Sequence, residues 1–179
     1  FNINSLNALL KIIEEPSIKN NFLLINNQAK PLIDTIKSRS SEIKISLNAN
    51  EMTEITSKLF EFFKQKRYFD SEILNVTPGS YIKFNYLVDK NDINLNNNYI
   101  ENIKIFVTLY KKEKIQDYID LLAFYTDYYF NTLRLKKIYE DDVIYKNRSY
   151  ILKSINDFYL YNLNQNTLIN NLKNNILHE

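Results

Sequence analysis

The spacing of apolar residues in this chain changes after Leu47, and from there to the end it is helical. Asn48 with Glu51 three residues later is the pattern of a capping box, which predicts a helix start at this point. The apolar face predicted for that helix consists of Met52, Ile55, Leu59, Phe62 and Phe63. A chain with this spacing over most of its length is expected to be mainly α.

Two shorter helices and a polar segment are expected next. Asp70 is placed to cap the first of them, and the turn signal Pro78-Gly79 precedes the second. Their apolar residues are Ile73 and Leu74 in the first helix, and Tyr81, Phe84 and either Leu87 or Val88 in the second. Three helices in this stretch make a small bundle. Residues 89–98 are polar, rich in asparagine and without a period, which predicts a linker.

Longer helices are predicted after this linker. The first has Ile103, Phe106, Val107 and Tyr110 on one face. The second, from about residue 114 to residue 139, carries Tyr118, Leu121, Leu122, Tyr125, Tyr128 and Tyr129. Because these residues surround most of its circumference, it is expected to be central or to lie at a subunit interface. The last two carry Ile151, Leu152, Ile155 and Phe158, and then, after a break at Asn162-Leu163-Asn164, Leu168, Ile169, Leu172 and Ile176.

Residues 1–47 have a different pattern, in which helix and strand signals alternate. The expected order is a helix with Leu6, Leu9, Leu10 and Ile13 that ends before Pro16, a strand over Phe22–Ile25, a helix from Pro31 with Leu32, Ile33 and Ile36, and a strand with Ile43, Ile45 and Leu47. The first strand is a continuous apolar run, typical of burial on both faces, and the second alternates with polar residues. Such an α/β segment is too small to hold a sheet alone.

The composition excludes several classes of site. The only glycine, Gly79, is not followed by Lys-Ser/Thr, whereas a phosphate-binding P-loop requires two glycines and that lysine. With no cysteine and one histidine, His178, the chain offers neither a zinc site nor a Ser-His or Cys-His nucleophile. No apolar run approaches about 18 residues, so no membrane span is expected. The absence of cysteine fits a reducing, cytoplasmic setting.

Three segments in the first 40 residues carry a family resemblance. They are Asn-Ala-Leu-Leu-Lys-Ile-Ile-Glu-Glu-Pro at 7–16, Phe-Leu-Leu-Ile-Asn-Asn at 22–27 and Ser38-Arg39-Ser40. In this order they resemble the clamp-loader subunits of bacterial DNA polymerase III, and most of all the delta-prime subunit. The resemblance places Asn27 at the sensor 1 position and Arg39, twelve positions later, at the arginine of the family's Ser-Arg-Cys motif. Ser40 stands where that motif has cysteine.

Weaker resemblance extends along the rest of the chain. Residues 78–82 resemble the start of the lid-domain helix that carries sensor 2, with Ile82 in place of its arginine. Residues 162–176 resemble the closing helix of the collar domain. The implied domains are the C-terminal part of an AAA+ core at 1–47, a helical lid at 48–98 and a helical collar for oligomerisation at 99–179. Because the chain starts at Phe1 without an initiator methionine, we expect a C-terminal fragment that lacks the P-loop half.

The resemblance implies a subunit that is not an enzyme on its own and holds no cofactor or metal. Its implied partners are the gamma/tau and delta subunits, and through the complex the sliding clamp and primed DNA. In this family Arg39 would act as an arginine finger on a neighbouring subunit's ATP, because a guanidinium stabilises the charge that spreads over the γ-phosphate oxygens. Ile82 cannot contact a phosphate, which fits a subunit without a working nucleotide site.

Alternatives remain open at this point. The chain is also compatible with a gamma/tau-type ATPase, which Ile82 disfavours, or with a helical interaction module built on an AAA+ remnant. An independent nucleic-acid binder is disfavoured by the net charge of +2. Arg39 could simply be an exposed arginine favoured by a helix dipole, and Asn27 could cap a strand end. The acidic residues Glu14-Glu15 and Glu140 to Asp142 are expected at helix ends or in a loop rather than in acid–base catalysis.

Overall fold

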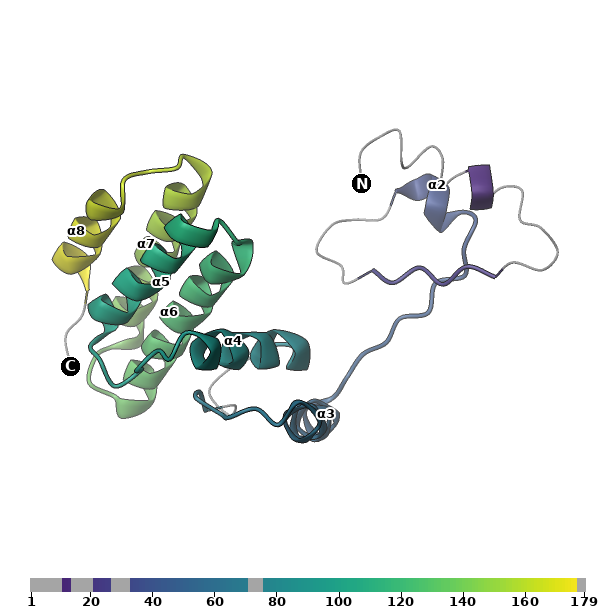
Figure 1. The fold of residues 1–179 in the computed structure, drawn as a ribbon, viewed down its shortest axis with the longest axis horizontal. Helices are drawn as coiled ribbons and strands as arrows, with labels where there is room; N and C mark the ends of the chain where they lie inside the picture. The colour runs from purple at the N-terminus through teal and green to yellow at the C-terminus, as the bar shows by residue number, and fades with distance from the viewer. Residues whose placement is uncertain (1–10, 14–20, 27–32, 71–75, 177–179) are drawn as a thin grey trace. The chain divides into compact units, whose positions relative to one another are not determined.

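The computed structural model describes residues 11–13, 21–26, 33–70 and 76–176 of the chain. It divides the chain into two compact units, Phe1–Leu47 and Asn48–Glu179, which are considered separately (Figure 1). The described residues are mainly helical and contain no strand, so the mainly α fold class is confirmed. None of the described helices is long and apolar enough to cross a membrane.

The first unit contains little regular structure among its described residues. Residues 11–13 are helical, and α2 spans Asp34–Lys37 with Ile36 buried. The two predicted strands are absent from residues 21–26 and 41–48, where Leu23, Ile25, Ile43 and Ile45 are each more than four-fifths exposed. A strand is stable only beside another strand, and the described residues provide none. The predictions at Leu6, Leu9, Leu10, Pro16, Asn27, Pro31 and Leu32 lie outside the described residues.

The second unit opens with two helices that pack on each other. α3 spans Ala49–Phe63 and begins at the predicted capping box, while α4 spans Pro78–Lys90 after the N-cap Thr77. In Figure 1 α3 is seen nearly end-on and α4 lies across the view, so the two helices cross steeply. The predicted apolar face of α4 is confirmed, since Tyr81, Phe84, Leu87 and Val88 are all buried. The helix expected after Asp70 lies outside the described residues.

The apolar face predicted for α3 is wrong at its C-terminal end. Phe62 is 78% exposed and Phe63 is 53% exposed, whereas Phe60 is buried against Tyr81 with ring centroids 5.5 Å apart. α3 packs mainly against α4, so its buried stripe is narrow. A helical period alone predicts a wider face, because it contains no information on how far the neighbouring helix extends.

The predicted linker is partly built into the core. α4 ends at Lys90, and within the following segment Ile93 is buried and Leu95 packs against the core. The side-chain amide of Asn102 donates hydrogen bonds to the carbonyl oxygens of Leu95 at 3.3 Å and Asn97 at 3.2 Å. The segment therefore has a defined path although its sequence has no period.

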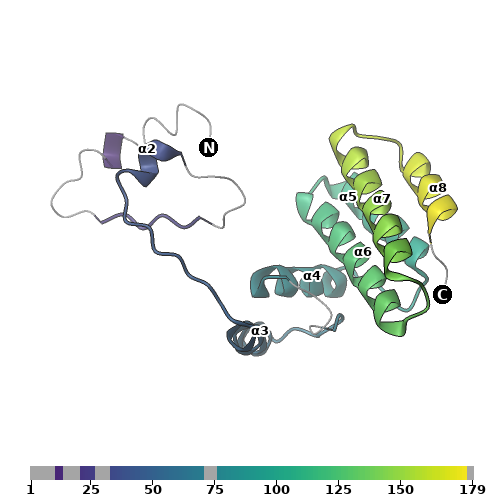
Figure 2. The ribbon, with the colours of Figure 1, turned by 180° about the vertical axis from the view of Figure 1, so that it is seen from behind.

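Four helices form a bundle in which each one packs against its two neighbours (Figures 1 and 2). They are α5 (Tyr99–Glu113), α6 (Gln116–Lys136), α7 (Asp141–Leu160) and α8 (Gln165–Asn175). The short connections make successive helices antiparallel. α6 contacts α5, α7 and α4, which confirms its predicted central place. Glu140 is the N-cap of α7, and Asp141 and Asp142 lie in its first turn, where the helix dipole favours acidic groups.

One hydrophobic core runs through the second unit from Phe60 to Ile176. Its largest fully buried side chains include Phe106, Tyr118, Phe130 and Phe158. The predicted apolar residues of the last helix, Leu168, Ile169, Leu172 and Ile176, all belong to it. The proposed boundary at residue 98 between lid and collar therefore lies within a single packed core.

Candidate functional site

Arg39 lies immediately after α2, on the surface of the first unit. Its Nη1 donates hydrogen bonds to the Thr35 carbonyl oxygen at 3.0 Å and to the Ser38 hydroxyl oxygen at 3.3 Å. The last carbonyl groups of a helix have no partners within the helix, and the helix dipole places partial negative charge there. The guanidinium is therefore attracted to this helix end, and its side chain is exposed.

The two serines beside Arg39 complete this helix end. The Ser38 hydroxyl donates to the Thr35 carbonyl oxygen at 3.1 Å, and the Ser40 hydroxyl donates to the Ile36 carbonyl oxygen at 2.7 Å. A thiol at position 40 is a weaker donor than a hydroxyl. The hydroxyl of Ser40 is therefore well suited to the hydrogen bond that it donates at this turn.

The chemistry available at Arg39 is that of a planar cationic fork. A guanidinium has five N–H donors in a fixed plane, which matches the oxygen atoms of a phosphate or a carboxylate. The same geometry is expected if Arg39 has only a structural role, in which its guanidinium hydrogen-bonds to the end of α2. The hydrogen bonds to Thr35 and Ser38 are compatible with both roles, and the difference between them is whether an anion is presented from outside the unit.

The other predicted site residues, Asn27 and Ile82, are considered separately from Arg39. Asn27 lies outside the described residues. Ile82 belongs to the other unit, where it is 8% exposed and packs in the core through α4. An apolar, buried side chain offers no hydrogen-bond donor or positive charge to a phosphate. The described residues contain no cluster of His, Asp or Glu that could hold a metal ion.

Two hollows in the second unit were not foreseen as sites. A groove of about 900 Å³ is lined by five tyrosines together with Lys104 and Lys173. A second hollow of about 540 Å³ lies beside the start of α4, and the charged side chains that line it pair with each other: Lys83 with Asp120, and Arg148 with Asp127. Tyr125, Tyr128 and Tyr129 were predicted only as part of a helix that is central or at a subunit interface, because the sequence does not show that α5, α6 and α8 leave a groove beside them.

Comparisons with known proteins relate only the first unit to a family. Neither a curated protein nor a solved structure matches the chain. Residues 1–49 match the family described as DNA polymerase III, delta subunit. This match relates the segment that contains Ser38, Arg39 and Ser40 to a DNA polymerase III clamp-loader family.

Proposed function

We propose that this chain is a delta-prime-like subunit of a DNA polymerase III clamp loader and that Arg39 supplies an arginine finger to a neighbouring ATPase subunit. The observation that most supports this proposal is that the family match over residues 1–49 includes the exposed Arg39. The proposed partners are the gamma/tau and delta subunits, and the proposed outcome is loading of the sliding clamp on primed DNA.

The local geometry supports this assignment in two ways. The hydrogen bonds of Ser38 and Ser40 to the carbonyl oxygens of α2 fix the turn that presents Arg39. An arginine that is held near an exposed helix end loses less freedom when it meets a phosphate than one on a long unstructured loop. Ile82 supports a subunit that completes a neighbour's site, since it provides no cation at its own sensor 2 position.

The test is ATP hydrolysis, stimulated by clamp and primed DNA, in a loader reconstituted with this chain or its variants. Arg39→Ala is expected to assemble normally and to lower turnover, while Lys37→Ala, which removes an exposed cation at the end of α2, leaves turnover unchanged. A single finger contributes about 10³–10⁵ in rate to well-studied GTPases. The loss here is expected to be smaller, because several ATP sites contribute to the total.

The variant Arg39→Lys distinguishes an arginine finger from an effect of positive charge alone. Lysine keeps the charge but lacks the planar fork, so a finger predicts that this variant stays impaired. Unchanged turnover in Arg39→Ala within an assembled complex would refute the finger and leave the subunit assignment standing.

A second candidate is a helical interaction module that shares only its first unit with clamp loaders. It is favoured by the match ending at residue 49, just where the second unit begins with its own hydrophobic core. This candidate predicts that the wild-type chain does not join the reconstituted complex. Size-exclusion chromatography of the mixture decides between the two candidates before any turnover is measured.

A further inference from the structure

We propose that the tyrosine-lined groove of the second unit binds a single strand of nucleic acid, with bases on tyrosine rings and phosphates at two lysines. This inference is independent of Arg39 and of the proposed function. The groove has a volume of about 900 Å³, and its tyrosines are Tyr68, Tyr99, Tyr125, Tyr128 and Tyr129. They come from α5, from α6 and from the segment after α3.

The aromatic rings are held in place by their neighbours. Tyr99 is stacked on Tyr129 with ring centroids 4.4 Å apart, and on Tyr125 at 5.7 Å with the two ring planes only 9° apart. Tyr128 meets Phe69 edge-to-face at 5.2 Å. Tyr99 and Tyr125 are buried, whereas Tyr128 and Tyr129 are half-buried. The inner rings therefore support the outer two, whose remaining surface is available to an aromatic ligand.

The hydroxyl groups of the buried tyrosines already form hydrogen bonds within the protein. The hydroxyl of Tyr99 shares a hydrogen bond with Thr126 at 2.8 Å, and burial raises the pKa of this phenol, so it stays neutral. The hydroxyl of Tyr125 accepts from Asn102 at 2.8 Å. The hydroxyls of the two inner tyrosines therefore add little hydrogen-bond specificity, and the ring surface offered to a ligand is that of Tyr128 and Tyr129. A binding mode that uses ring faces without reading base edges is typical of single-strand binders with little sequence preference.

The charges of the groove favour an anionic ligand. Lys104 of α5 is half-buried and Lys173 of α8 is exposed, and neither forms an ion pair with a described carboxylate. Glu101 is the acidic residue among the described lining residues, and it also forms no ion pair with a described basic residue. The two lysines come from separate helices, so a strand with several phosphates offers more than one charge for them, whereas a nucleoside monophosphate offers a single phosphate.

The experiment is fluorescence anisotropy of a labelled deoxythymidine oligonucleotide of about 12 nucleotides, titrated with the full chain. Tyr128→Ala is expected to weaken binding about tenfold, while Tyr128→Phe, which keeps the ring, binds like the wild type. Tyr150→Ala, which removes an exposed tyrosine of α7 outside the groove, is the matched control and leaves binding unchanged. Far-UV circular dichroism confirms that each variant is folded.

Salt dependence tests the two lysines. The double variant Lys104→Gln with Lys173→Gln is expected to reduce the slope of log K against log salt by about 1.4, since each phosphate contact of a single strand contributes about 0.7. Lys153→Gln, on the exposed surface of α7, leaves the slope unchanged. Glu101→Gln is expected to tighten binding, because it removes the opposing charge.

Three outcomes would overturn the proposal. Equal binding by wild type and Tyr128→Ala would show that base stacking plays no part. Equal competition by polyglutamate would show that the groove takes any polyanion, including an acidic peptide. Competition by thymidine monophosphate as strong as that by the oligonucleotide would show a mononucleotide site instead of a strand site.

Discussion

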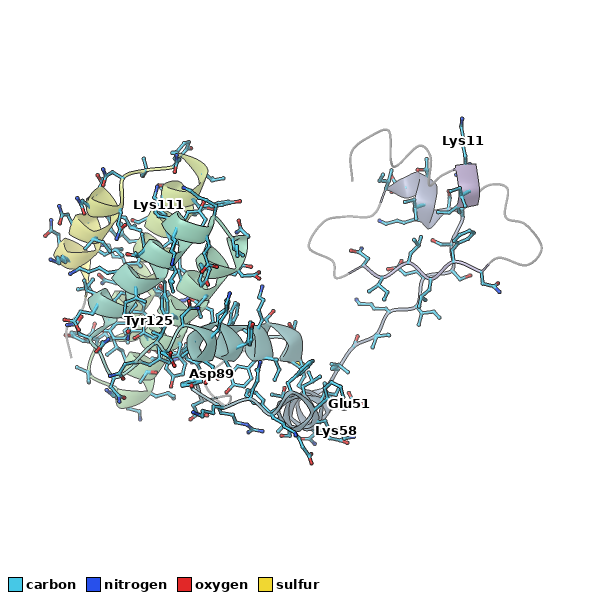
Figure 3. All side chains as sticks on the ribbon, viewed as in Figure 1. Lys11, Glu51, Lys58, Asp89, Lys111 and Tyr125 are labelled. Carbon is cyan, nitrogen blue, oxygen red and sulfur yellow. The ribbon has the colours of Figure 1, made fainter. Side chains whose placement is uncertain are left out.

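Asn102 donates a hydrogen bond to the hydroxyl of Tyr125 at 2.8 Å in the interior of the bundle (Tyr125 is labelled in Figure 3). The same amide nitrogen also holds the carbonyl oxygens of Leu95 and Asn97, while the Asn102 Oδ1 is buried without a described hydrogen-bond partner. One side chain thus connects α5, α6 and the segment before α5. Its role depends on the amide being a donor.

Asn102→Asp is therefore expected to be strongly destabilising. A carboxylate at this position would face two carbonyl oxygens and a hydroxyl in a buried site, so the free energy of unfolding should fall by about 3 kcal/mol. Tyr125→Phe removes only one acceptor and is expected to cost about 1 kcal/mol. Urea denaturation followed by circular dichroism measures both. Equal stability of wild type and Asn102→Asp would contradict this account of the junction.

Glycine substitution at a helix end is expected to stabilise the chain. Lys64, Lys114 and Lys137 end their helices in the left-handed conformation, and Lys137 has a φ of 54°. A side chain costs about 1 kcal/mol in this region, and glycine avoids that cost. Lys137→Gly should therefore raise the free energy of unfolding by about 0.5–1 kcal/mol.

The matched control for Lys137→Gly is Lys153→Gly within α7. Lys153 is exposed and helical, so glycine there adds backbone freedom without relieving strain and should cost about 1 kcal/mol. Thermal denaturation of the two variants should shift the melting temperature in opposite directions. A decrease in both would refute the role of the left-handed cap.

The elements of the second unit could be predicted because their signals are local. Asn48 and Glu51 exchange hydrogen bonds at 3.0 Å and 2.8 Å, as the capping-box pattern predicts. The apolar residues of α4 and α8 are buried as expected, since a long helical period identifies the face that meets a core.

Features that depend on how one element packs against another could not be predicted from the sequence. The run at residues 22–25 has strand character, yet strand formation requires a partner strand that the described residues do not provide. The groove beside Tyr128 arises from the way α5, α6 and α8 pack, which no single helical period contains. The proposed action of Arg39 likewise depends on a neighbouring subunit, which the sequence of this chain does not describe.

Two of the phenylalanines of α3, Phe60 and Phe62, test where its buried stripe ends. Phe60 packs on Tyr81 and beneath the guanidinium of Arg67 at 4.8 Å, so Phe60→Ala should lower the free energy of unfolding by about 3 kcal/mol. Phe62 is 78% exposed, and Phe62→Ala should change it by about 0.5 kcal/mol at most. Denaturant titration compares them directly, and similar losses in both would place Phe62 in the core after all.

Lys83 should stabilise the contact between α4 and α6 in a pH-dependent way. Its Nζ lies 2.8 Å from Asp117 Oδ1 and 3.3 Å from Asp120 Oδ2. Burial lowers the pKa of Lys83, but the hydrogen bonds and charges of the two aspartates outweigh it, so the pKa is raised overall. A raised pKa means that the charged form stabilises the fold below the ordinary lysine value of about 10.4, and that this contribution is lost as pH rises through the folded value.

Lys83→Met is accordingly expected to lower the free energy of unfolding by about 0.5–1 kcal/mol at neutral pH. The effect is modest because the ion pairs of Lys83 are only partly shielded from water. The difference from wild type should shrink above pH about 10.4 and also in about 1 M salt, where charges are screened within about 3 Å. Lys58→Met, which breaks the fully exposed pair with Glu54, serves as the control and should leave stability unchanged. If the loss of stability in Lys83→Met stays constant across pH and salt concentration, the lost packing of the lysine alkyl chain is responsible and the lost charge is not.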